Sequence, residues 1–82
     1  MVRVVYSKEF EQDVKKIRDK ALKERLIKQV ETILKNPETG KPLRYNLKGE
    51  RSVYVPPYRL VYTLLDDKIY LLRFRHREDV YE

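Results

Sequence analysis

The chain has 82 residues, with 19 Lys and Arg against 13 Asp and Glu, so its formal net charge is +6. This length predicts a single domain over residues 1–82, and the positive charge favours RNA, DNA or an acidic protein as a partner. The absence of cysteine excludes disulfides, thiolate metal sites and a Cys nucleophile. Because no apolar run approaches the ~20 residues of a membrane span and no signal peptide is recognisable, we expect a cytoplasmic protein without a membrane partner.

The N-terminal part predicts a strand followed by a helix. Residues 2–6 are mostly β-branched or aromatic, and Ser7 is a suitable N-cap because its hydroxyl can accept a backbone N–H. The helix that follows is expected to end near residue 18. Its apolar residues recur at helical spacing: Phe10, Val14 and Ile17.

A second helix is predicted to begin after Asp19 and to end before Pro37, since the residue before proline avoids the helical region. Its apolar stripe consists of Leu22, Leu26, Val30 and Ile33, widened by Ile27 and Leu34. Two amphipathic helices with a short connection predict an antiparallel hairpin. A hairpin with so wide an apolar stripe needs a sheet to cover it.

The remaining chain supplies that sheet. Residues 39–49 contain Gly, Pro and several basic residues and are interpreted as a basic loop. Three strands are expected over residues 51–55, 58–65 and 69–75, separated by turns at Pro56-Pro57 and at residues 66–68. The pattern therefore predicts an α+β domain.

The register of the last two strands follows from the length of their turn. A three-residue turn places Leu60, Tyr62 and Leu64 on the same face as Tyr70, Leu72 and Phe74, which we expect to be the core face. Arg59 then lies directly opposite Arg75 on the other face, where two like charges are tolerated if an anion binds there. A two-residue turn would mix arginines into the apolar face and is the less favoured alternative.

The sequence contains no Gly-rich phosphate loop, metal-ligand cluster or catalytic triad. What it offers is a group of basic and aromatic residues near the C-terminus. Cleavage of RNA by its own 2′-hydroxyl needs a base, an acid and positive charge on the phosphorane, but no metal. The candidate catalytic residues are Arg59, Arg75, Arg77, His76 and Tyr81, and the candidate RNA-binding residues are Lys41, Arg44, Lys48, Arg51 and Arg73.

Four of the catalytic candidates differ in the chemistry that they could supply. Arg59 and Arg75 would hold the charge, and His76 is the only side chain of a type that titrates near neutral pH. Tyr81 would stack on a base or donate a proton. The alternative is that these residues are simply solvent-exposed strand ends in a basic protein.

Two segments resemble the signature of the RelE family within the RelE/ParE superfamily: Tyr58-Arg59-Leu60-Val61-Tyr62 and Arg75-His76-Arg77-Glu78-Asp79-Val80-Tyr81. The resemblance implies a β-α-α-β-β-β domain whose four-stranded, mostly antiparallel sheet packs on the helical hairpin. It also implies the toxin of a type II toxin-antitoxin system, an endoribonuclease without metal or cofactor that cleaves mRNA in the ribosomal A site. The implied partners are a RelB-like, partly acidic antitoxin, the ribosome and mRNA.

The resemblance also assigns roles to single residues. Arg59 matches the arginine that stabilises the phosphate, Arg75 matches the arginine that acts at the leaving group, and Arg77 is the alternative for that second role. Tyr81 matches the tyrosine that stacks on the substrate base.

This sequence departs from the family on one strand. The family's ribonucleases carry two lysines there, and the matching positions are Ser52 and Tyr54. The general base therefore stays open among Lys48, Glu50 and Arg51. A gyrase inhibitor of the ParE type, or a degenerate toxin that only binds its antitoxin, remains the alternative function.

Overall fold

The computed structural model describes residues 3–42 and 49–79. Its elements are β1 (Arg3–Tyr6), α1 (Lys8–Lys15), α2 (Lys20–Lys35), β2 (Lys41–Pro42), β3 (Glu50–Val55), β4 (Tyr58–Leu65), β5 (Lys68–His76) and the 3₁₀-helix η2 (Arg77–Asp79). The strands form one sheet in the order β1-β5-β4-β3-β2. β1 is parallel to β5 and the other pairs are antiparallel, so the predicted α+β class is confirmed.

The sheet has five strands where the sequence predicted four. The additional strand is β2, whose Lys41 pairs with Ser52 and whose Pro42 pairs with Arg51. It lies in the segment interpreted as a basic loop. Two residues are too few to show a strand periodicity, so only their pairing with β3 identifies them as a strand.

Both helices begin where their capping residues predict. The Ser7 hydroxyl accepts the Phe10 N–H at 2.9 Å and donates to the Leu72 carbonyl at 2.9 Å, which ties the start of α1 to β5. The Asp19 carboxylate accepts the Ala21 and Leu22 N–H groups at the start of α2. α1 ends at Lys15, slightly before the predicted end near residue 18.

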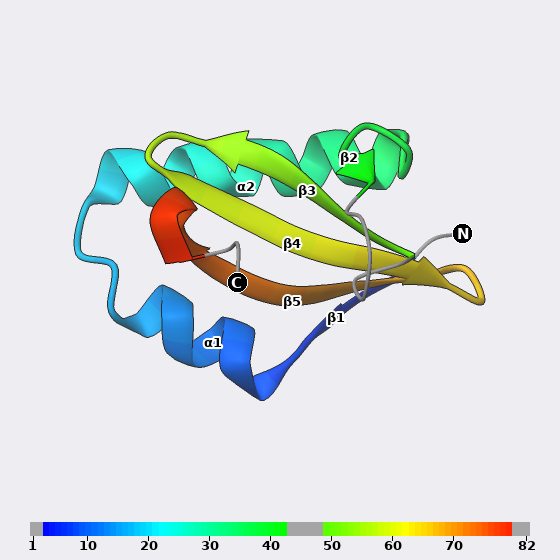
Figure 1. The fold of residues 1–82 in the computed structure, drawn as a ribbon, viewed down its shortest axis with the longest axis horizontal. Helices are drawn as coiled ribbons and strands as arrows, with labels where there is room; N and C mark the ends of the chain where they lie inside the picture. Colours follow the sequence, from blue (N-terminus) through cyan, green and yellow to red (C-terminus); the bar gives the residue numbers. More distant parts are fainter. Residues whose placement is uncertain (1–2, 43–48, 80–82) are drawn as a thin grey trace.

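Both helices pack on the same sheet, α1 against β5 and α2 against β3. Figure 1 shows α2 behind β3 and β4, with α1 beside the lower edge of β5. One apolar core lies between the helices and the sheet. It comprises Phe10, Ile17, Leu22, Leu26, Ile33, Val53, Val55, Leu60, Tyr62, Ile69, Leu71 and Phe74.

The turn between β4 and β5 is shorter than predicted. Leu65 pairs with Lys68, which leaves a two-residue turn made of Asp66 and Asp67, both with positive φ. Such a turn matches the twist of a hairpin, and aspartate tolerates its left-handed conformation better than most residues. The predicted three-residue turn is therefore wrong.

A β-bulge corrects the register further along the hairpin. Tyr62 pairs with Leu71 but Val61 pairs with Arg73, so Leu72 is the extra residue of β5. Beyond the bulge Arg59 lies opposite Arg75, as predicted.

The bulge also changes which residues of β5 enter the core. Before the bulge Ile69 and Leu71 fill the core in place of the predicted Tyr70 and Leu72, and Phe74 fills it beyond the bulge as expected. Leu60 and Tyr62 are buried as predicted, whereas Leu64 is 44% exposed near the turn.

The connection from α2 to β2 is held by hydrogen bonds to side chains of the sheet. The Tyr62 hydroxyl donates to the Pro37 carbonyl at 2.7 Å and accepts the Gly40 N–H at 2.9 Å. A Cβ atom at Gly40 would lie 2.9 Å from that hydroxyl and from the Ser52 carbonyl oxygen, so the close approach requires glycine. Burial raises the pKa of Tyr62 above its ordinary value.

Candidate functional site

The face of the sheet opposite the core carries a row of three cross-strand neighbours. Tyr54 on β3 pairs with Arg59 on β4, and Arg59 pairs with Arg75 on β5. The guanidinium carbon of Arg59 lies 5.2 Å from the centroid of the Tyr54 ring, within the range of a cation–π contact. Arg59 Nη1 also lies 3.4 Å from the Ser52 hydroxyl oxygen. The two arginines predicted to hold a phosphate are thus neighbours.

Arg77 joins this row from η2. Its backbone N–H donates to the Pro57 carbonyl at 3.0 Å, which anchors η2 beside the turn between β3 and β4. Figure 1 shows η2 at that end of the sheet. The Arg77 guanidinium then reaches the Tyr54 hydroxyl, with Nη1 and Oη 3.4 Å apart. We call Tyr54, Arg59, Arg75 and Arg77 the Tyr54 cluster.

Tyr54 is the member of this cluster that the sequence argument did not assign to the site. The family resemblance matches Tyr54 only to a position where the family's ribonucleases carry a lysine. The signal that identifies it is alternation: Val53 and Val55 are buried in the core, so the residue between them points to the opposite face. Its side chain is 40% exposed there.

The Tyr54 cluster has the chemistry of a phosphodiester site. Like charges directly opposite each other destabilise a sheet, so a bound anion between Arg59 and Arg75 would be stabilising. The forked donors of a guanidinium match the oxygens of a phosphate. An exposed aromatic ring beside them offers a surface on which a base can stack.

His76 does not belong to this cluster. Successive strand residues point to opposite faces, so His76 shares the core side of β5 with Phe74 while Arg75 faces the other way. Its ring contacts Tyr58 edge-on at a centroid distance of 5.7 Å. Its Nδ1 accepts the Glu78 N–H at 3.3 Å. His76 therefore lies on the other face of β5 from the row that Tyr54, Arg59 and Arg75 form.

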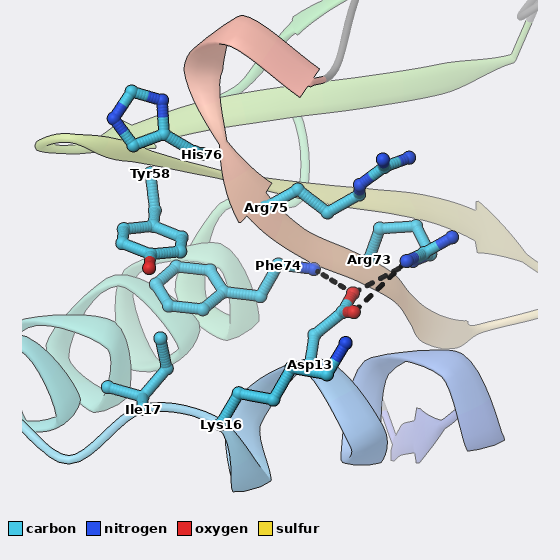
Figure 2. Close-up of a pocket in the computed structure, with 8 residues that line it drawn as sticks. All are labelled: Asp13, Lys16, Ile17, Tyr58, Arg73, Phe74, Arg75 and His76. Carbon is cyan, nitrogen blue, oxygen red and sulfur yellow. Dashed lines mark hydrogen bonds and ion pairs between the residues drawn. The ribbon is translucent and has the colours of Figure 1, made fainter.

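Arg73 is engaged by the buried carboxylate of Asp13 on α1. Arg73 Nε lies 2.8 Å from Asp13 Oδ2 and Nη2 lies 3.0 Å from Oδ1. Asp13 Oδ2 also accepts the Phe74 N–H at 3.0 Å. Figure 2 shows these contacts between α1 and β5.

The ion pair changes the acidity of both partners. Burial of Asp13 favours its neutral form, but the hydrogen bonds from Arg73 and Phe74 outweigh this effect, so the pKa of Asp13 is lowered. The hydrogen bond to Asp13 raises the pKa of Arg73. A residue predicted to bind RNA therefore has two of its nitrogens committed to the scaffold.

The signal for Asp13 lies in its position on the helix. It follows Phe10 by three residues and precedes Ile17 by four, so a carboxylate sits on the apolar face of α1. A charged residue on that face indicates a partner inside the protein, although the sequence does not say which.

Two other predicted RNA-binding residues, Lys41 on β2 and Arg51 on β3, lie outside the Tyr54 cluster. Arg51 donates to the Gly40 carbonyl at 2.7 Å and to the Glu38 carbonyl at 3.3 Å, which holds the start of β2. Lys41 is exposed and pairs with Ser52, so it shares the face of the cluster. The remaining predicted residues, Arg44, Lys48 and Tyr81, lie outside the described residues.

The part of the chain that the structure describes has neither a metal-binding group of side chains nor a membrane-spanning helix. Residues 3–42 and 49–79 contain no group of His, Cys, Asp and Glu side chains able to hold a metal ion. Within the same residues, neither helix has the length and apolarity needed to cross a membrane.

Residues 4–81 match the model of a protein family described as ParE toxin of type II toxin-antitoxin system, parDE. Among solved structures, the chain is similar to a YoeB/ParE toxin from Agrobacterium tumefaciens, with a TM-score of 0.85 and 16% identity over 93% of this chain and 99% of the other. At this identity the likeness concerns the fold. No curated protein sequence matches the chain.

Two toxin-antitoxin complexes are also similar. One is RelBE2 from Mycobacterium tuberculosis, with a TM-score of 0.79 and 28% identity over 93% of this chain and 98% of the other. The second is the DinJ-YafQ complex from E. coli, with a TM-score of 0.75 and 26% identity over 100% of both chains. Because the family model spans nearly the whole chain and the fold agrees with it, this protein belongs to the ParE toxin family of type II toxin-antitoxin systems.

Proposed function

We propose that this toxin is a ribosome-dependent endoribonuclease that cleaves mRNA in the A site and so inhibits translation. The observation that supports this proposal is the Tyr54 cluster, in which Arg59 and Arg77 contact one exposed ring and Arg75 lies opposite Arg59. In the reaction, the 2′-oxygen loses its proton and attacks the adjacent phosphorus. The bond to the 5′-oxygen breaks, that oxygen takes up a proton, and a 2′,3′-cyclic phosphate remains.

Each member of the cluster has a role in this scheme. Arg59 and Arg75 bind the non-bridging oxygens, whose negative charge grows in the transition state. Arg77 donates to the Tyr54 hydroxyl oxygen, which orients the phenol so that its own proton is available to the departing 5′-oxygen. Tyr81, outside the described residues, is proposed to stack on the base, as the family resemblance implies.

The base that removes the 2′-proton is not among the Tyr54 cluster. Arg51 points to the core side of β3 and is engaged with Gly40 and Glu38. Glu50 shares the face of Tyr54 but lies four residues away along β3, which is about 13 Å in a strand. Lys48, outside the described residues, remains a candidate, and a group of the ribosome is the other source.

We also propose that the protein is held inactive by a cognate antitoxin that is RelB-like and partly acidic. Two of the similar structures are toxin-antitoxin complexes. The net charge of +6 favours an acidic segment that folds as it binds.

A toxin that acts by binding alone is the second candidate. It would be a gyrase inhibitor of the ParE type or a degenerate toxin that retains only antitoxin binding. The observation in its favour is on β3, where Ser52 and Tyr54 occupy the positions at which the resemblance implies lysines. Neither side chain is a base like lysine, and Ser52 is moreover buried.

One experiment separates these candidates. After induction of the chain without its antitoxin, primer extension on a translated message should reveal cuts at codon positions that disappear when translation initiation is blocked. Purified protein should reproduce the cuts on programmed ribosomes. Inhibited gyrase supercoiling with intact mRNA would instead support the binding candidate, and growth at the uninduced rate would support the degenerate one.

A further inference from the structure

β5 extends well beyond its parallel neighbour β1. The last pair between them is Tyr6 with Leu71, whereas β5 continues to His76. Ser7 and Asp13 satisfy the next backbone groups of that edge, at Leu72 and Phe74. The edge is thereby kept from pairing with another strand, and a groove forms beside it.

This groove has a volume of about 240 Å³ and lies between the end of α1 and the last part of β5. Figure 2 shows its lining, with aromatic side chains on one side and charged side chains on the other. The residues are Asp13, Lys16, Ile17, Tyr58, Arg73, Phe74, Arg75 and His76.

The aromatic side consists of the partly exposed rings of Tyr58 and His76, which lie over the buried Phe74. The Tyr58 ring stacks on Phe74 at a centroid distance of 5.0 Å with 18° between the planes, and His76 meets Tyr58 edge-on. Because Nδ1 of His76 accepts a backbone N–H, a neutral His76 carries its proton on Nε2. His76 is thus a hydrogen-bond donor beside an aromatic surface, a combination suited to a nucleobase.

The charged side carries an excess of positive charge. Asp13 and Arg73 form an ion pair and neutralise each other. Among residues 3–42 and 49–79, neither Lys16 nor Arg75 forms an ion pair with a carboxylate. Lys16 and Arg75 therefore contribute two further positive charges to the groove. A phosphate group satisfies such a pair of cations.

Arg75 connects the groove to the Tyr54 cluster, because it lines the groove and also lies opposite Arg59. We infer that the groove is a second nucleotide-binding subsite, which holds the nucleotide next to the one whose phosphate lies at the Tyr54 cluster. Lys16 and Arg75 would bind its phosphate, and Tyr58 and His76 would contact its base. This inference rests on the proposed function in taking single-stranded RNA as the ligand and the Tyr54 cluster as the place of the neighbouring phosphate.

The test measures binding of a short single-stranded RNA that 2′-O-methylation protects from cleavage, by fluorescence anisotropy at several salt concentrations. Lys16→Gln should weaken binding about three- to tenfold and reduce the slope of log K against log salt by about 0.7, the value for one phosphate contact on a single strand. The matched control is Lys15→Gln, which removes the same charge from the same helix outside the groove. His76→Ala should also weaken binding without changing the salt slope.

A second measurement uses single-turnover cleavage on programmed ribosomes. Lys16→Gln and His76→Ala should raise the concentration needed for half-maximal rate and leave the maximal rate unchanged, because neither residue contacts the reacting atoms. The subsite is refuted if Lys16→Gln and Lys15→Gln bind RNA equally, or if the unaltered protein does not bind the oligonucleotide. It is also refuted if Lys16→Gln weakens only antitoxin binding, which would assign the groove to the antitoxin.

The two proposals fail separately. RNA binding that depends on Lys16, together with intact mRNA on ribosomes, would support the subsite and refute the nuclease. Cleavage with equal behaviour of the Lys16 and Lys15 variants would support the nuclease and refute the subsite.

Discussion

Arg73 and Arg75 lie two residues apart on the same strand and on the same face of the sheet, yet their surroundings differ. Arg73 lies opposite the buried Val61 and is held by two hydrogen bonds to Asp13. Arg75 lies opposite another arginine, in the Tyr54 cluster. One guanidinium joins α1 to the sheet, and the other is proposed to bind an external anion.

The difference comes from a residue sixty positions away in the sequence, the carboxylate on α1 that reaches Arg73. Arg51 and Arg59 show the same contrast across β3 and β4. Arg51 holds the backbone of residues 38–40, whereas Arg59 lies over the Tyr54 ring. The comparison divides the arginines of β3, β4 and β5 into two that support the fold and two that form the candidate site.

The largest effect that tests this division is expected at Arg59. Arg59→Ala should lower single-turnover cleavage on programmed ribosomes by about two to three powers of ten, the usual loss when one preorganised transition-state contact is removed. Its melting temperature should change little, because removal of the like-charge cross-strand pair offsets the loss of the contacts to Tyr54 and Ser52. Arg59→Lys should restore activity only in part, since a point charge cannot make a forked contact.

This prediction fails in two distinguishable ways. Equal cleavage by the Ala variant would make Arg59 a surface residue. Lost cleavage with a large drop in melting temperature would move Arg59 to the supporting group.

The next effect concerns the supporting arginine. Asp13→Asn should lower the free energy of unfolding by about 1–3 kcal/mol, because it weakens the contacts to Arg73 and to the Phe74 N–H. The loss stays below that of a fully buried ion pair, since the Arg73 side chain is 39% exposed. Urea denaturation measures it, with Glu11→Gln, an exposed position on α1, as the matched control. Equal stability of the two variants would contradict the supporting role.

Two tyrosines sharpen the same comparison on a smaller scale. Tyr62→Phe should cost about 1–2 kcal/mol, because the buried hydroxyl that joins Pro37 and Gly40 is lost and a buried N–H is left unsatisfied. Tyr54→Phe should leave stability nearly unchanged and lower cleavage, since its exposed hydroxyl is proposed to act in the site. Denaturation curves and single-turnover rates on both variants decide the matter; the reverse pattern would exchange their roles.

The smallest effect appears only in acid. Because the pKa of Asp13 is lowered in the folded protein, its ionised form stabilises the fold at all pH values above its ordinary pKa of 3.8. This contribution to stability is lost as the pH falls from 3.8 through the lower pKa that Asp13 has in the folded protein. The stability difference between the unaltered protein and Asp13→Asn should therefore shrink between pH 5 and pH 2 in urea titrations. A constant difference over that range would show that the charge of Asp13 does not stabilise the fold.

Local sequence signals were sufficient for the helices. Ser7 and Asp19 cap them through hydrogen bonds within three residues, and Asn36 ends α2 before proline. These interactions depend on a few neighbouring residues, so their pattern is visible in the chain itself. The expected register of the last hairpin predicted that Arg59 lies opposite Arg75, and the structure confirms this pairing.

The path to that pairing was not predictable. A two-residue turn and a bulge at Leu72 together produce the same Arg59–Arg75 register as the expected three-residue turn without a bulge. The two errors cancel at the arginines but not near the turn, where Ile69 and Leu71 enter the core. A bulge is decided by how the strand packs on helices that are distant in sequence, and alternation assumes that none is present.

The sequence by itself therefore determined the α+β class, the starts of both helices and the end of α2. Only the tertiary structure decided which arginines support the fold, because Asp13 reaches Arg73 and the carbonyls of Glu38 and Gly40 accept from Arg51. It also placed Tyr54 with the arginines and His76 on the opposite face. Helical periodicity and capping are local properties of the chain, whereas the partner of a charged side chain depends on segments that meet only when the protein folds.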